Sequence, residues 1–161
     1  MYCNSLIKYD RFNTRGVKVG DLGIGGKNPI RIQSMTTTNT MDVLATVEQS
    51  IRLVEEGCEL VRITAPSINE ANILKNIRSE LEKRSCFVPL VADIHFTPNA
   101  AEVAARIVQK VRVNPGNYAD KKRFNIIEYS DRQYNDEIER LNIKFSPLVK
   151  ICKDYGTAMR I

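Results

Sequence analysis

Two pairs of polar residues, each set inside an apolar run, are the candidates for chemistry in this sequence of 161 residues. Asp93 and His95 alternate around Ile94, and Arg112 and Asn114 alternate around a valine. Residues two apart in a β-strand share a face, so each pair projects from one side of its strand. Ionisable groups in a buried strand need partners or a ligand to offset their desolvation. The stretch from 91 to 117 therefore predicts a binding site.

The carboxyl ends of the other predicted strands also carry polar groups, and ligands of parallel α/β folds bind at those ends. Arg62, Arg112 and Arg160 would converge there, and the planar guanidinium suits phosphate oxygens. Asp93 could balance one arginine or accept hydrogen bonds from substrate hydroxyls, and His95 could donate to a phosphate or transfer a proton. The remaining candidates at these ends are Gln33, Ser34, Met35, Thr36 and Thr64. A phosphorylated small molecule is the predicted ligand.

Each of these residues also has a purely structural interpretation. Arg62 and Asp93 could form an ion pair that ties neighbouring strands, and a lone histidine such as His95 is often structural. Arg160 could simply be solvated, and the segment that starts at Asn114 could be only a turn, because Pro-Gly between two asparagines favours one. The joint pattern across several strand ends is what favours a site.

Alternating strands and helices must position these residues. Apolar strand runs are expected at 59–64, 88–94, 110–114 and 158–161, and helical periodicity at 43–54, 69–81, 98–107 and 130–155. Asp42 or Thr40 could cap the first helix, and Asn69 could cap the second. Thr97 could cap the third helix, because the proline that follows it suits the first position of a helix. In the last helix, Pro147 should produce a kink or a break. A polar loop is expected at 34–40.

The N-terminal part predicts a β-hairpin. Residues 17–19 and 30–33 read as two short strands about a glycine-rich turn. Gly23 and Gly25 begin a GxGxxG pattern, but Asn28 stands where the third glycine belongs and a strand follows, which favours a turn over a nucleotide loop. Residues 1–15 should be a loose leader, and residues 16–161 the domain.

The predicted fold class is α/β, with about five parallel strands, right-handed crossovers and an N-terminal β-hairpin. An open doubly wound sheet fits the length, but a partial TIM (β/α)₈ barrel fits the placement of the polar residues better. The full barrel would need further strands.

Composition narrows the class of partner. The net charge of +5 suits an anionic ligand, but basic and acidic residues are interleaved, so we expect neither a nucleic acid nor a membrane as partner. Cys3, Cys58, Cys86 and Cys152 are scattered singly, which predicts reduced structural thiols and no metal site. No long apolar run or signal peptide is evident, which predicts a cytoplasmic protein.

Five motifs carry a resemblance to a known family. In chain order they are QSMT (33–36), VRIT (61–64), VADIHF (91–96), RVNPGN (112–117) and MRI (159–161). From about Thr14 to Ile161 the chain resembles the 4-hydroxy-3-methylbut-2-enyl diphosphate synthases of the methylerythritol phosphate route to isoprenoids. The long stretch from Tyr118 to Tyr155 is similar to the insert-bearing branch.

The resemblance implies a TIM barrel that binds 2-C-methyl-D-erythritol 2,4-cyclodiphosphate. Arg62, Arg112 and Arg160 would hold the diphosphate with His95 nearby. Asp93 and Asn114 would face its polar groups beside the loop of Gln33, Ser34, Met35 and Thr36. It also implies a second domain with a four-iron four-sulfur (4Fe-4S) cluster on three cysteines and a glutamate, reduced by a ferredoxin or flavodoxin type of donor. The oligomeric state is left open, and a homodimer is one of the states that the resemblance allows.

The later strands and the cluster domain of that family have no counterpart here, so these residues are expected to be an N-terminal fragment that is inactive alone. Unpaired sheet edges also predict self-association. Two rival readings remain. One is a pterin-binding barrel enzyme of the dihydropteroate synthase type, and the other is a non-catalytic module that binds anions or nucleic acids.

Overall fold

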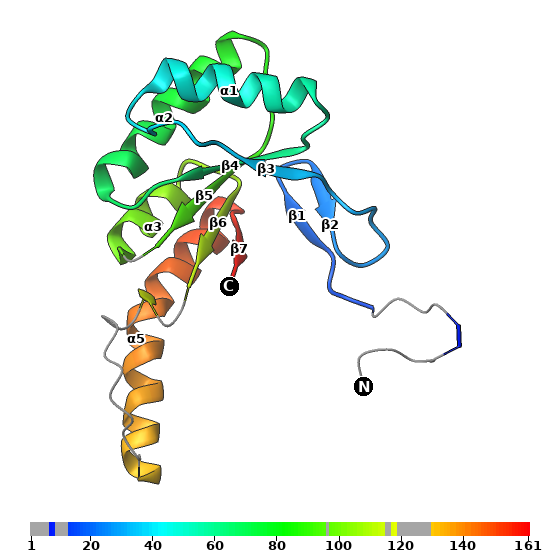
Figure 1. The fold of residues 1–161 in the computed structure, drawn as a ribbon. Helices are drawn as coiled ribbons and strands as arrows, with labels where there is room; N and C mark the ends of the chain where they lie inside the picture. Colours follow the sequence, from blue (N-terminus) through cyan, green and yellow to red (C-terminus); the bar gives the residue numbers. More distant parts are fainter. Residues whose placement is uncertain (1–6, 9–12, 96, 115–116, 119–129) are drawn as a thin grey trace.

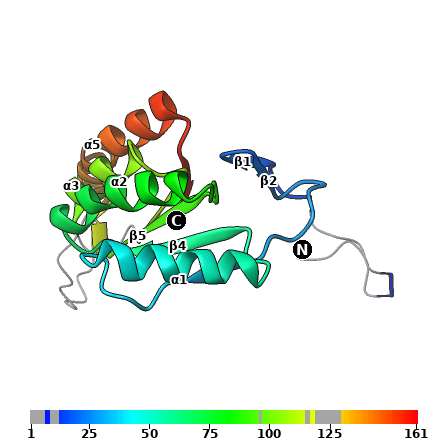
Figure 2. The same cartoon turned by 90° about the horizontal axis from the view of Figure 1, so that it is seen from above.

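A computed structural model describes residues 7–8, 13–95, 97–114, 117–118 and 130–161. Its main sheet has five parallel strands in the order β3-β4-β5-β6-β7, which confirms the predicted strand number and direction (Figure 1). The strands are β3 (Gln33–Met35), β4 (Leu60–Thr64), β5 (Leu90–Ile94), β6 (Lys110–Val113) and β7 (Ala158–Arg160). Spatial order follows chain order and the helices lie along one side of the sheet, as in part of a (β/α)₈ barrel (Figure 2).

Among the described residues, four helices cover the outer face of this sheet. They are α1 (Val43–Glu55), α2 (Ile68–Lys83), α3 (Pro98–Ala105) and α5 (Asp131–Tyr155). Seen from above in Figure 2, they form an arc around the strands, and the C-terminus lies inside that arc. Asp42 caps α1 by accepting from the Ala45 amide. Ser67, rather than the predicted Asn69, caps α2, because its hydroxyl accepts from the Asn69 amide.

Helix α5 is a single helix of 25 residues that contains Pro147, so of the kink or break predicted at this proline, the break does not occur. Its start is fixed by a capping box between Ser130 and Gln133, and its end by Gly156, whose φ of 67° is the left-handed conformation that glycine adopts readily. Leu148 and Cys152, just after the proline, are buried against the sheet. This packing offsets the backbone hydrogen bond that a proline removes.

A two-stranded antiparallel hairpin precedes the barrel sheet. It joins β1 (Val17–Val19) to β2 (Leu22–Ile24) through Gly20 and Asp21. Gly20 has a φ of 59°, as a two-residue hairpin turn requires. The hairpin is confirmed, but the second strand predicted at 30–33 is wrong. The GxGxxG glycines lie within β2 and the turn after it, and no helix follows, so the structure favours the turn over a nucleotide loop.

The two faces of the five-stranded sheet pack differently. The outer face forms the main core under the helices, with Val61, Ile63, Ala92 and Val111 among its fully buried residues. The inner face forms a smaller apolar cluster at its lower, amino-terminal end. That cluster consists of Leu60, Val91 and Ala158 of the sheet, packed with Val19, Leu22 and Ile24 of the hairpin. The hairpin therefore closes the lower end of the partial barrel and leaves the upper end to the polar residues.

The predicted leader at 1–15 falls largely outside the described residues, as do Cys3, Phe96 and the Pro-Gly of the RVNPGN motif. Within the described part of the chain, no helix combines the length and the apolar composition needed to cross a membrane.

Candidate functional site

The register of the parallel strands assembles the predicted residues on one face. One row across the sheet pairs Thr64 with Asp93, Asp93 with Arg112, and Arg112 with Arg160. The row below contains Met35, Arg62, Val91, Lys110 and Ala158. Paired residues of parallel strands project to the same side, and so do residues two apart. Both rows therefore line the inner face, and the apolar hairpin cluster lies at their lower end.

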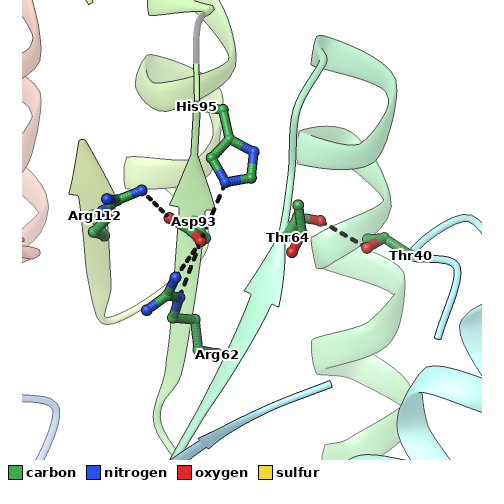
Figure 3. A network of polar contacts seen from close by, with 6 residues as sticks. All are labelled: Thr40, Arg62, Thr64, Asp93, His95 and Arg112. Carbon is green, nitrogen blue, oxygen red and sulfur yellow. Dashed lines mark hydrogen bonds and ion pairs between the residues drawn. The ribbon is translucent and has the colours of Figure 1, made fainter. Parts of the chain in front are cut away.

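Asp93 is the centre of the site and its side chain is completely buried. Its Oδ2 atom accepts from Arg62 through Nε at 3.0 Å and Nη2 at 2.5 Å. Its Oδ1 atom accepts from Nη1 of Arg112 at 3.0 Å. Nε2 of His95 lies 3.5 Å from Oδ2, and Figure 3 shows all three side chains converging on this carboxylate. One buried carboxylate thus contacts side chains from β4, from β6 and from the residue that follows β5.

The side chains of Arg62 and Arg112 are not fully enclosed by their contacts with Asp93. The side chains of Arg62 and Arg112 are 24% and 31% exposed, so each guanidinium keeps an accessible side. A guanidinium has five N–H donors in a fixed plane, and Asp93 takes only some of them. The predicted ion pair between Arg62 and Asp93 is real. The bonds to Asp93 also hold the guanidiniums of both arginines in place on the inner face.

The other predicted residues surround this core at the upper end. Arg160 is exposed and registers with Arg112, while His95, just after β5, has a side chain that is 37% exposed. Asn114 is exposed, and its carbonyl accepts from the Asn117 and Tyr118 amides. The Pro-Gly of the turn predicted after β6 lies outside the described residues, and Asn114 stands at the carboxyl end of β6.

The segment of Gln33, Ser34, Met35 and Thr36 is only partly the predicted loop. Its first three residues form β3, because they pair in parallel register with β4. Gln33 and Met35 register with Leu60 and Arg62 on the inner face. Ser34 registers with Val61 of the outer core, and its amide donates to the Cys58 sulfur. Thr36, which begins the loop, is buried. Only Gln33 and Met35 therefore lie on the face of the site.

The loop after β3 is fixed to the next strand. The hydroxyl of Thr40 donates to the Thr64 carbonyl at 2.7 Å, as Figure 3 shows. The Thr36 amide donates to the Arg62 carbonyl at 3.0 Å. These bonds hold the upper ends of β3 and β4 together at the level of Asp93.

Sequence reasoning missed Lys110, which lies on the inner face two residues before Arg112 on β6. Burial and the neighbouring charges of Arg160 and Arg62 lower the pKa of its ammonium below the usual 10.5. The alternation of Lys110, Arg112 and Asn114 is a signal for this placement. It is a weak one, because Lys110 begins its strand, where lysines are usually solvated.

Three cysteines lie in the described part of the chain, and all are free thiols. Cys58 is buried and donates to the Leu60 carbonyl, and burial raises the pKa of the Cys152 thiol. Among the described residues, no cluster of three histidine, cysteine or carboxylate side chains could hold a metal ion. The reduced, structural role predicted for Cys58 and Cys152 agrees with this placement.

Comparison with known proteins adds an independent finding. Residues 14–161 match the family model described as the GcpE TIM-barrel domain. The chain is 52% identical over 160 residues to a 4-hydroxy-3-methylbut-2-en-1-yl diphosphate synthase (flavodoxin) of Akkermansia muciniphila, covering 99% of this chain and 27% of the relative. The enzyme of the same name from Leptospira interrogans is 54% identical over 153 residues, covering 95% and 23%.

A plant protein is similar over the same range. The chain is 45% identical over 161 residues to the chloroplastic 4-hydroxy-3-methylbut-2-en-1-yl diphosphate synthase (ferredoxin) of Oryza sativa, covering 99% of this chain and 22% of the relative. The chain thus spans about a quarter of the length of these curated relatives.

Proposed function

Because the chain belongs to the GcpE TIM-barrel domain family, we propose that it is the substrate-binding part of an isoprenoid-pathway oxidoreductase. The proposed reaction converts 2-C-methyl-D-erythritol 2,4-cyclodiphosphate reductively to 4-hydroxy-3-methylbut-2-enyl diphosphate. The observation that carries the proposal is the charge of the inner face. Its described residues include four cationic side chains, Arg62, Lys110, Arg112 and Arg160, and one carboxylate, Asp93.

Such an excess of positive charge on a partly buried face favours an anionic ligand, because the cations repel one another until it is bound. Each phosphoryl group of a cyclic diphosphate carries an ionised oxygen, so the ligand offers two anionic centres. We propose that Arg62, Arg112 and Arg160 hold these centres, with Asp93 as the positioning residue that fixes the first two arginines. Because Asp93 is fully buried, it would act on the ligand only by positioning these two arginines.

The polar residues at the mouth would contact the rest of the substrate. His95 and Asn114 follow β5 and β6, so they lie beside the arginines and can donate hydrogen bonds to hydroxyl or phosphoryl oxygens. Gln33 and Met35 would form the opposite side of the pocket on β3. Ser34 and Thr36 would support that wall from behind. Residues 16–161 would form the N-terminal part of the barrel domain.

Ring opening and removal of a hydroxyl need electrons, which a 4Fe-4S cluster would supply in the full-length protein. The described cysteines do not fit such a group, because Cys58 and Cys152 are buried separately and no suitable ligand cluster exists among the described residues. We therefore propose that the cluster ligands lie outside the described residues. The flavodoxin and ferredoxin in the relatives' names support a redox protein as electron donor.

The rival readings have less support. A pterin-binding site needs a carboxylate free to accept from the ligand's nitrogens, whereas both oxygens of Asp93 already accept from arginines. A nucleic-acid module would need an extended basic surface, and the cations of this site lie on the inner face of a curved sheet.

Calorimetric titration of the full-length protein with the cyclodiphosphate tests the proposal. We expect saturable binding, with inorganic phosphate much weaker and with no binding of a pteridine or of duplex DNA. Reductive turnover should require the full-length protein, and the isolated 161-residue chain should give none. Tight binding of the pteridine, or turnover by the isolated chain, would contradict this reading.

A further inference from the structure

Lys110 has no role among the residues that the sequence motifs indicate, yet it lies inside the site. It begins β6 on the inner face, two residues before Arg112, and its register partners are Val91 on β5 and Ala158 on β7. Rows two residues apart on a strand are separated by about 6.6 Å, so Lys110 lies one row below the Asp93 row. It is half-buried.

The neighbours of Lys110 favour an ammonium directed away from the hairpin. Val91 and Ala158 belong to the apolar cluster that Val19 seals from below. A lysine stem packs well on such a surface, but the charged end must reach a more polar region. The polar region of this inner face lies above, at the Asp93 row.

The charges around Lys110 are of its own sign. Arg62, in the same row on β4, and Arg160, one row higher on β7, both act on its ammonium. Asp93 is engaged by Arg62 and Arg112, and no ion pair to Lys110 exists among the residues that the structure describes. A half-buried lysine between two arginines therefore costs the folded chain free energy, and an anionic ligand would remove that cost.

We propose that Lys110 is a further substrate-binding residue, whose ammonium contacts the phosphoryl group that lies deepest in the barrel. The inference rests on the proposed function, because that function supplies the diphosphate. Lys110 would form the floor of the anion site and the arginines its walls, so that cations from β4, β6 and β7 enclose the ligand.

This arrangement makes Lys110 a residue that supports binding at the expense of folding. A lysine with a purely structural role has the opposite signature, because its removal breaks a contact that the folded state needs. Stability and affinity therefore change in different directions under the two interpretations, and one substitution separates them.

The test compares Lys110→Met with Lys83→Met in the full-length protein. Methionine keeps the apolar stem without the charge. Lys83 is an exposed lysine of α2, and its side chain is 70% exposed. We expect Lys110→Met to weaken calorimetric binding of the cyclodiphosphate by roughly 10- to 100-fold, the effect of losing one charge-assisted contact. Its Tm should equal or exceed that of the wild type. Inorganic pyrophosphate should show the same loss, and Lys83→Met should bind normally.

Three results would overturn the inference. Unchanged affinity in Lys110→Met, with normal binding by the wild type, rejects Lys110 as a ligand and leaves the proposed function standing. A lowered Tm together with weaker binding would assign Lys110 a structural role, such as pairing with a carboxylate elsewhere in the full-length protein. Failure of the wild type to bind the cyclodiphosphate rejects the proposed function and this inference with it.

Discussion

Arg62 and Asp93 are joined through a single carboxylate oxygen. Oδ2 of Asp93 accepts from both Nε and Nη2 of Arg62, which leaves Oδ1 to accept from Arg112. Because β5 lies between β4 and β6, one buried side chain links arginines from both of its neighbours. The geometry of the cationic site therefore depends on one residue that has no exposed surface of its own.

Replacing Asp93 should test this dependence. Asp93→Asn keeps the shape but leaves two guanidiniums without their charge partner, and it turns an amide group toward one of them. Breaking a buried ion pair from one side costs about 3–5 kcal/mol, so we expect a loss of unfolding free energy in that range. Urea denaturation of the full-length protein measures it. Asp154→Asn, at an exposed position of α5, is the control, and equal losses in both variants would refute the central role of Asp93.

Substitutions of Arg112 and Arg160 should differ in their effects on the unfolding free energy and on ligand affinity. Arg112 bonds Asp93, whereas Arg160 is exposed and has no ion pair among the described residues. Arg112→Met should therefore lower both the unfolding free energy and the affinity for the cyclodiphosphate. Arg160→Met should lower affinity about tenfold or more, and change stability by no more than about 0.5 kcal/mol. Denaturation and calorimetry on the same samples check both, and a stable Arg112→Met with normal binding would contradict the model.

The hairpin offers a matched pair of valines on one strand. Val19 is 1% exposed and packs under the barrel, whereas Val17 is 39% exposed. Val19→Ala should lower the unfolding free energy by roughly 2 kcal/mol, the transfer term for two methyl groups plus a small cavity. Val17→Ala should stay within about 0.5 kcal/mol of the wild type. Similar effects at both positions would show that the hairpin does not seal the barrel.

Lys110 should leave a trace in the dependence of stability on pH. Burial and the charges of Arg160 and Arg62 lower its pKa in the folded chain, so between that value and 10.5 the unfolded chain binds more protons. The contribution of Lys110 to the free energy of unfolding therefore rises with pH in that window. Below the window, the destabilisation by the charged ammonium is fully present. Relative to the wild type, Lys110→Met should gain most stability near neutral pH and least near pH 10, roughly the ordinary lysine pKa. Denaturation at both pH values measures this difference, and a constant difference would argue against it.

The isolated 161-residue chain should associate with itself. Strands β3 and β7 are the edges of the described sheet, and each has a partner on one side only. An apolar groove of about 500 Å³ lies beside Leu141, Phe145, Val149 and Ile161. Exposed strand edges and apolar surface favour association. Light scattering should detect oligomers that Val149→Glu reduces, and a stable monomer at high concentration would contradict the expectation.

The two-residue alternation of strands made the centre of the site predictable. It placed Asp93 with His95 and Arg112 with Asn114, and the ion pair between Arg62 and Asp93 was foreseen as one interpretation. The role of Asp93 as a link between two arginines was not foreseen, because it depends on the register of three strands. Register arises from pairing across the sheet, which a single sequence does not display.

The errors near the N-terminus have a common cause. Alternating Ile30 and Ile32 suggested a strand, yet they are 80% and 60% exposed. The strand forms instead at Gln33–Met35, because this segment pairs with β4. Edge strands bond on one side only, so their bounds follow the neighbour more than their own apolar pattern. The cap of α2 has a separate cause, because Ser67 lies two residues before the predicted Asn69 and its hydroxyl accepts from the Asn69 amide.

The hairpin under the sheet has a consequence for access. Val19, Leu22 and Ile24 cover the lower end of the inner face against Leu60, Val91 and Ala158, so that end is closed to a ligand. An anion that reaches the cationic rows of this chain must therefore approach from the upper end or past the edge strands β3 and β7.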